Sequence, residues 1–139
     1  MSRISDPVLG NLEFRHSWKG TCSITFVGKE IPLKLSVQGS PDKAITAEQR
    51  KAYENALKRL PILKEYQDEL VRYCQIDAPE GCIDIETIPF VVHPEVLLLT
   101  YEGGFGLLCT YDYEPEHGIA IYAQSSNGKI LVGPQDEIL

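Results

Sequence analysis

The last 63 residues of the chain, 77–139, have almost no basic side chains: Lys129 is their only lysine or arginine. The same segment carries eleven aspartates and glutamates, whereas the first 76 residues carry twelve lysines and arginines against nine acids. The net charge of −7 is thus the sum of +3 and −10. The acidic balance argues against nucleic acid, because phosphates require a basic footprint. It favours a partner that is itself basic.

Long apolar runs are also absent. The most apolar stretch, residues 90–99, is broken by His93, Pro94 and Glu95, and it is far shorter than the about 20 residues that a membrane-spanning helix requires. The first seven residues contain neither an apolar segment nor a small-residue cleavage pattern, so we expect no signal peptide. The composition is near the globular average, with 43% hydrophobic and 24% charged residues. We therefore expect a cytoplasmic protein without membrane contact.

Cysteine and histidine motifs are missing as well. Cys22, Cys74, Cys82 and Cys109 form no C-x-x-C pair, and no histidine stands at zinc-finger spacing from them. Four cysteines permit two disulfides, but the lack of an export signal favours reduced thiols. We expect buried free cysteines, no metal and no cofactor.

The chain length fits a single domain, 1–139. Strand patterns fill residues 1–40, a helical pattern fills 46–76, and strand patterns return over 90–139. This order favours an α+β fold with an antiparallel sheet, because parallel pairs would require more crossover helices. We predict a sheet of N-terminal and C-terminal strands with one kinked or split central helix packed on it.

Two hairpins have clear local signals. Residues 21–27 and 30–38 alternate around Gly28-Lys29, which predicts a turn with Gly28 at its first position. Asn127-Gly128 is the strongest hairpin signal in the chain, because both residues tolerate positive φ.

The central helical pattern has a defined start and an internal break. Thr46 and Gln49 fit a capping box, in which each side chain accepts a hydrogen bond from the other residue's backbone N–H. Pro61 interrupts the apolar stripe, so we expect two helical segments or one kinked helix between Ala47 and Gln75. Residues 77–89 are expected to form a loop or an irregular edge.

The densest polar group of the chain lies between two predicted strands and contains Asp112, Glu114, Glu116 and His117. Such a group could chelate a cation, but metal ligands usually come from distant segments, and the other two histidines lie elsewhere. Pro115 indicates a bend here, with Gly118 restarting the next strand. Three interpretations stay open: a structural corner, an acidic patch that binds a partner, and a metal or catalytic site.

Catalytic signatures are not found. Residues 103–106 read Gly-Gly-Phe-Gly, but no helix is predicted after them and no Lys-Ser/Thr pair is present, so a phosphate-binding loop is excluded. No cysteine and histidine share a local signature of nucleophilic catalysis. We expect the protein not to be an enzyme.

Short motifs at both ends of the chain do form a recognisable set. They are Leu9–Glu13, Trp18–Gly20, Thr46–Gln49, Gly106–Leu108, Tyr111–Ala120 and Val132–Asp136. With these motifs the chain resembles an uncharacterised bacterial family of small domains of unknown function. Members are often found beside polymorphic or contact-dependent toxins and are regarded as immunity proteins. In that family the corner usually reads Trp-Asp-Glu-Glu-His-Gly, whereas here Tyr111 takes the Trp position and Tyr113-Glu114-Pro115 lengthens the corner. The family has no established catalytic residues, so the resemblance implies none.

The resemblance and the acidic half together favour a non-enzymatic binding protein, specifically an immunity protein that neutralises a cognate bacterial toxin through an acidic face. Tyrosines beside the carboxylates would add anchors, because tyrosine is enriched at interface hot spots. The partner-binding residues that we predict are Glu102, Tyr111, Asp112, Tyr113, Glu114, Glu116, His117, Asp136 and Glu137. The expected partner is a basic toxin domain, and the protein itself is expected to be a monomer or a weak homodimer.

Two other classes of function stay open. A small metal-dependent or acid/base enzyme would use His117 with Glu116 or Asp112. A regulatory module would bind a peptide along a sheet edge.

Overall fold

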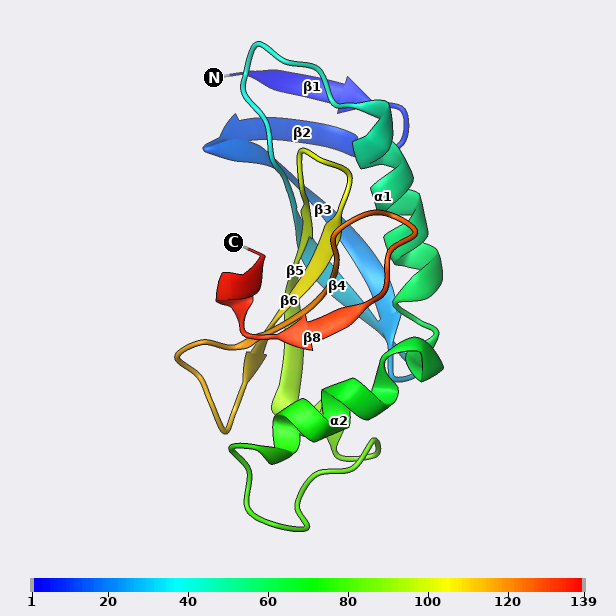
Figure 1. The fold of residues 1–139 in the computed structure, drawn as a ribbon. Coiled ribbons are helices and arrows are strands. Elements are labelled where there is room, and N and C mark those ends of the chain that lie inside the picture. Colours follow the sequence, from blue (N-terminus) through cyan, green and yellow to red (C-terminus); the bar gives the residue numbers. More distant parts are fainter. Residues whose placement is uncertain (1, 139) are drawn as a thin grey trace.

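A computed structural model describes residues 2–138 of the chain (Figure 1). Met1 and Leu139, the two ends of the predicted 1–139 domain, lie outside the described residues. The chain forms an eight-stranded sheet whose strands lie side by side in the order of the sequence. The strands are β1 (Arg3–Asp6), β2 (Gly10–Arg15), β3 (Ser17–Phe26), β4 (Lys29–Val37), β5 (Val92–Leu99), β6 (Phe105–Tyr111), β7 (Ile119–Ala123) and β8 (Leu131–Gly133).

The sheet is mixed, because β4 and β5 run parallel while the other neighbouring strands run antiparallel. The parallel pairing extends from Lys34 opposite Val96 to Val37 opposite Leu99. The prediction of an antiparallel sheet with one kinked or split central helix packed on it is therefore wrong. A parallel pair needs a long crossover connection. The whole helical segment between β4 and β5 is that crossover.

The crossover contains several small helices instead of one. They are α1 (Ala47–Arg59), the 3₁₀ turn η1 (Leu63–Glu65), α2 (Gln67–Gln75) and α3 (Ile88–Val91), and a second 3₁₀ turn, η2 (Gln135–Glu137), follows β8. The predicted capping box is confirmed, because the Thr46 hydroxyl accepts from the Gln49 N–H at 3.0 Å and the Gln49 side chain accepts from the Thr46 N–H at 3.1 Å. α1 ends at Arg59, and Pro61 directly follows its C-cap, Leu60. Within residues 2–138, no helix has the length and apolar character needed to cross a membrane.

The two faces of the sheet are covered unequally. One face packs against α1 and α2, and its buried residues include Leu35, Leu97, Phe105 and Leu107. The other face has a smaller apolar cluster over β5 to β8, formed by Leu98, Leu108, Ala120 and Tyr122. Ile138, just after η2, packs on this second cluster. A Cβ on Gly106 would approach the Ile138 side chain to 2.7 Å, so the glycine leaves the space that Ile138 fills.

The turn between β3 and β4 differs by one residue from the predicted one. Phe26 pairs with Lys29, so the two turn residues are Val27 and Gly28 rather than Gly28-Lys29. Both have positive φ, 48° and 77°, as a type I′ turn requires. Positive φ is rare for a β-branched residue such as valine, and no local signal predicts it.

Candidate functional site

The predicted polar group lies in the connection between β6 and β7, which we call the acidic corner (residues 112–118). Backbone hydrogen bonds fix its shape: the Asp112 N–H donates to the Val91 carbonyl at 3.0 Å, and the Glu114 N–H donates to the Tyr111 carbonyl at 3.1 Å. The Gly118 N–H closes the corner by donating to the Glu114 carbonyl at 3.3 Å. Gly118 has φ +62° and leads into β7, which fits its predicted place at the start of the next strand.

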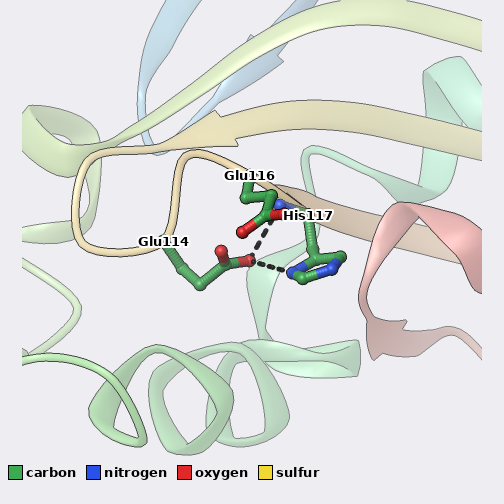
Figure 2. Close-up of side chains that lie close together, drawn as sticks. All are labelled: Glu114, Glu116 and His117. Atoms are coloured by element: carbon green, nitrogen blue, oxygen red, sulfur yellow. Dashed lines mark hydrogen bonds and ion pairs between the residues drawn. The ribbon is translucent and has the colours of Figure 1, made fainter.

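The side chain of Glu114 turns back onto the corner, as Figure 2 shows. Its Oε2 accepts from the His117 N–H at 2.9 Å and lies 3.2 Å from His117 Nδ1. One possible ligand atom from each of Glu114, Glu116 and His117 falls within a 4.8 Å group. The interpretation as a structural corner is therefore confirmed, because hydrogen bonds fix the bend, while partner binding and metal binding stay predictions.

The C-terminal residues are attached to this corner through Gln135. Its backbone N–H donates to the His117 carbonyl at 3.2 Å, and its side-chain amide donates to the Cys109 carbonyl at 2.9 Å. These bonds place η2 beside the corner, so Asp136 and Glu137, both exposed, lie near the acidic patch. Residues that are separated by about twenty positions in sequence thus share one part of the surface.

The two tyrosines of the corner have different positions. Tyr111 is buried, and its hydroxyl donates to the Cys74 carbonyl at the end of α2 at 2.5 Å. Tyr113 is 40% exposed and packs edge-on against Tyr111, with ring centroids 5.8 Å apart. Of the two rings, only that of Tyr113 is exposed, and Tyr111, which we predicted as a partner-binding residue, is buried.

Two large apolar side chains that sequence reasoning missed are exposed beside the corner. Ile76 is 72% exposed and Phe90 is 73% exposed. Ile76 lies two residues after Cys74, whose carbonyl accepts the Tyr111 hydroxyl. Phe90 precedes Val91, whose carbonyl accepts the Asp112 N–H. We use the term corner surface for this set of side chains: Ile76, Asp77, Phe90, Asp112, Tyr113, Glu114, Glu116, His117, Asp136 and Glu137.

A signal for Ile76 exists in the sequence, and none exists for Phe90. Leu70 and Cys74 lie on the buried stripe of α2, and Ile76 falls outside this spacing, which marks it as exposed. Phe90 stands next to the apolar residues that begin β5, and only the short helix α3 turns it outward.

Negative charge dominates the corner surface. Among the ion pairs of residues 2–138, its carboxylates are paired only with imidazoles: Asp112 Oδ1 lies 3.1 Å from His93 Nε2, and Glu114 lies beside His117. The charges also act on nearby groups. Burial raises the pKa of Tyr73, and the carboxylates of Glu114 and Asp77 raise it further.

Glu102 lies apart from the corner surface. It belongs to the turn between β5 and β6 and lines a shallow pocket of about 500 Å³ on the second face of the sheet. Tyr122 and Glu137 line the same pocket. Glu137 also belongs to the corner surface, so it lies between Glu102 and the other predicted partner-binding residues. Burial and then the charge of Glu137 raise the pKa of Tyr122.

Three of the four cysteines, Cys22, Cys74 and Cys109, are not activated as nucleophiles. Burial raises the pKa of Cys22 to about 11 and that of Cys74 to about 12. Burial also raises the pKa of Cys109. All three thiols are therefore protonated at neutral pH, whereas a catalytic cysteine needs a lowered pKa. All four cysteines are free, as predicted, but Cys82 is exposed.

Comparison with known proteins identifies the family of the chain. A family model described as a domain of unknown function (DUF6985) matches residues 8–139. No curated protein and no solved structure matches the chain. The predicted resemblance to a domain of unknown function is confirmed, while its association with toxins stays a prediction. The chain belongs to the DUF6985 family.

Proposed function

We propose that this DUF6985 member is a non-enzymatic binding protein, an immunity protein that neutralises a basic toxin domain through the corner surface. The observation that carries the proposal is the arrangement of exposed carboxylates without lysine or arginine partners around the exposed side chains of Ile76, Phe90 and Tyr113. A stable interface has this composition, an apolar centre with a charged rim.

Each part of the surface has a separate physical role. The carboxylates create a negative potential that steers a basic partner toward the corner and accelerates its association. Phe90 and Tyr113 offer large rings, which bury apolar area with few rotatable bonds. Charge thus acts mainly on the association rate, and the apolar side chains act mainly on the dissociation rate.

The test uses the product of the gene directly upstream of this one as the candidate toxin. Co-expression should protect cells from this toxin, and the two purified proteins should associate. Replacing Glu116 with lysine should slow association about tenfold at low salt, because it reverses one steering charge. Glu54→Lys on the exposed face of α1 is the matched control and should leave the rate within about twofold. Stopped-flow fluorescence at two salt concentrations measures the association rate of both variants.

The apolar part is tested by a matched pair of isoleucines. Ile76→Ser should accelerate dissociation about tenfold, whereas Ile62→Ser, on an exposed isoleucine after α1, should not. No protection in co-expression and no association of the purified proteins would reject the proposal. Binding with equal losses in Ile76→Ser and Ile62→Ser would retain the function and move the interface elsewhere.

The grouped ligand atoms of Glu114, Glu116 and His117 favour one rival, a small metal-dependent enzyme centred on His117. In the corner, however, Glu114 already accepts the His117 N–H, and the group lies on an exposed bend. Calorimetric titration with Zn²⁺, Mn²⁺ and Ca²⁺ separates the two functions. Micromolar binding that is lost in His117→Ala would support the rival.

A further inference from the structure

Besides its two outer strands, the sheet has a third unpaired strand edge, which lies along part of β3. β2 pairs with β3 from Arg15 opposite Ser17 to Glu13 opposite Lys19, and the pairing stops there. β3 continues to Phe26, so its last seven residues pair with β4 alone. Residues 21–26 of this segment form an edge strand on the β2 side, which we call the β3 edge.

The hydrogen-bonding groups of the β3 edge follow from the turn that ends it. In a two-residue type I′ turn, Phe26 and Lys29 form a hydrogen-bonded pair. Counting back by twos, the backbone groups of Ile24 and Cys22 point to β4. The N–H and C=O groups of Thr25, Ser23 and Thr21 therefore point away from β4, toward the open side.

The β3 edge lacks charge and proline, two of the features that normally protect edge strands. Its sequence, Thr-Cys-Ser-Ile-Thr-Phe, contains no charge and no proline and is rich in β-branched residues. The two outer edges of the sheet differ. β1 has four residues with charges at Arg3 and Asp6, and β8 has three residues followed by Pro134. Only the β3 edge combines length with high strand propensity and no charge.

We propose that the β3 edge pairs with the β3 edge of a second copy of this chain. An antiparallel pair centred on Ser23 uses all three outward-facing residues: Ser23 opposes Ser23 of the other copy, and Thr21 opposes Thr25. Threonines that face each other across strands are a favourable pair. The result is one continuous sheet through two copies with two-fold symmetry.

The inner side of the same edge supports this pairing. Cys22 is half-buried at the border of the core, and the half-buried Tyr53 of α1 lies close to it. Both side chains would be covered by the second copy, which adds apolar contact to the backbone hydrogen bonds. The dimer does not use the corner surface and does not depend on the proposed function.

Sedimentation velocity of the purified full chain tests the pairing. We expect a dimer that forms with a dissociation constant on the order of 10–100 µM, as is typical of a small interface. Ser23→Lys places two lysines opposite each other and should weaken dimerisation at least about tenfold. Thr110→Lys, at an exposed position of β6, adds the same charge away from the edge and should leave the dimer unchanged. A wild-type protein that stays monomeric at millimolar concentration, or a Ser23→Lys variant that dimerises like wild type, would overturn the proposal.

A cross-link tests the register independently of the stability of the variants. Opposed residues of a hydrogen-bonded antiparallel pair lie about 5.5 Å apart at Cα, within reach of a disulfide. In a Cys82→Ser background, Ser23→Cys should form a covalent dimer under mild oxidation, and Thr110→Cys should not. Cross-linking of Thr110→Cys with none for Ser23→Cys would place the interface elsewhere and overturn the proposal.

Discussion

At the scale of single residues, Glu114 organises the acidic corner. Its carboxylate accepts the His117 N–H and faces the His117 ring, so a substitution there changes the shape of the corner together with its charge. Glu116 makes no such bond within residues 2–138, and its charge can be reversed without loss of an internal contact. Charge reversal at Glu116 is therefore the cleaner probe of partner binding.

Tyr111 gives a prediction at the same scale. Tyr111→Phe removes the hydroxyl that donates to the Cys74 carbonyl and leaves that carbonyl without its partner. We expect a loss of about 1–3 kcal/mol in the free energy of unfolding, the usual range for a buried group that loses its hydrogen bond. Urea denaturation measures it. Tyr113→Phe is the control and should cost less than about 0.5 kcal/mol, because Tyr113 is partly exposed and makes no such bond. Equal losses in both variants would contradict the structural role of Tyr111.

At the scale of elements, the link between β1 and α1 predicts a pH dependence. Asp6 is buried, with a side chain 3% exposed, and accepts from Arg50 and from the N–H groups of Val8 and Leu9. Burial alone raises the pKa of Asp6, but these hydrogen bonds outweigh it and hold the pKa below its ordinary value of 3.8. The unfolded chain therefore binds the proton more readily. The stabilisation is full above the ordinary value and is lost as the pH falls through the folded pKa.

Asp6→Asn removes this stabilisation. We expect the variant to be less stable than wild type by about 2 kcal/mol at pH 6, since a buried charged acceptor is lost. The difference should shrink as the pH falls below 3.8, the ordinary value, because Asp6 of the wild type then also becomes protonated as the pH passes its lowered pKa. Urea denaturation across this pH range measures it. A difference that stays constant down to pH 2 would show that Asp6 acts through packing alone.

Features that depend on neighbouring residues could largely be predicted from the sequence, whereas pairing between strands far apart in the chain could not. The capping box of Thr46 and the break at Pro61 follow from neighbouring residues, and both are present. Asn127 and Gly128 lie between β7 and β8, but neither has the positive φ that we expected, and the connection runs from Ala123 to Leu131. The parallel pairing of β4 with β5 depends on two strands far apart in sequence, and no residue in either strand signals it. The same holds for the candidate site: charge counts located the corner, but Phe90 becomes part of it only through α3.

At the scale of the whole molecule, the sheet contains two kinds of strand pairing: antiparallel pairs of strands that are close in sequence, and one parallel pair of strands that are far apart in sequence. Each antiparallel neighbour is connected by a short segment, but 54 residues lie between Val37 and Val92 on the two sides of the parallel pair. Closing this long connection costs more chain entropy than closing any hairpin. We therefore expect the folding transition state to contain the β4–β5 pairing.

A matched pair of leucines tests this expectation. Leu97 of β5 and Leu12 of β2 are both buried, so each Leu→Ala substitution should cost about 2–5 kcal/mol. Leu97→Ala should mainly slow folding, with a φ-value above about 0.5, while Leu12→Ala should mainly accelerate unfolding, with a φ-value below about 0.3. Stopped-flow chevron plots measure both. Similar φ-values would mean that the parallel pairing is not the limiting step.

The order of the strands also has a consequence for synthesis on the ribosome. β4 emerges long before β5, so its outer side has no neighbour while the helices are being made. On that side β4 carries Pro32 and Lys34, residues that discourage pairing with foreign strands in a nascent chain. β5 later pairs with Lys34–Val37 and ends the exposure of that part of β4, while Pro32 stays on the part that β5 does not reach. The β3 edge has no such residues and stays unpaired in the folded protein, so it remains available to pair with a second copy of the chain.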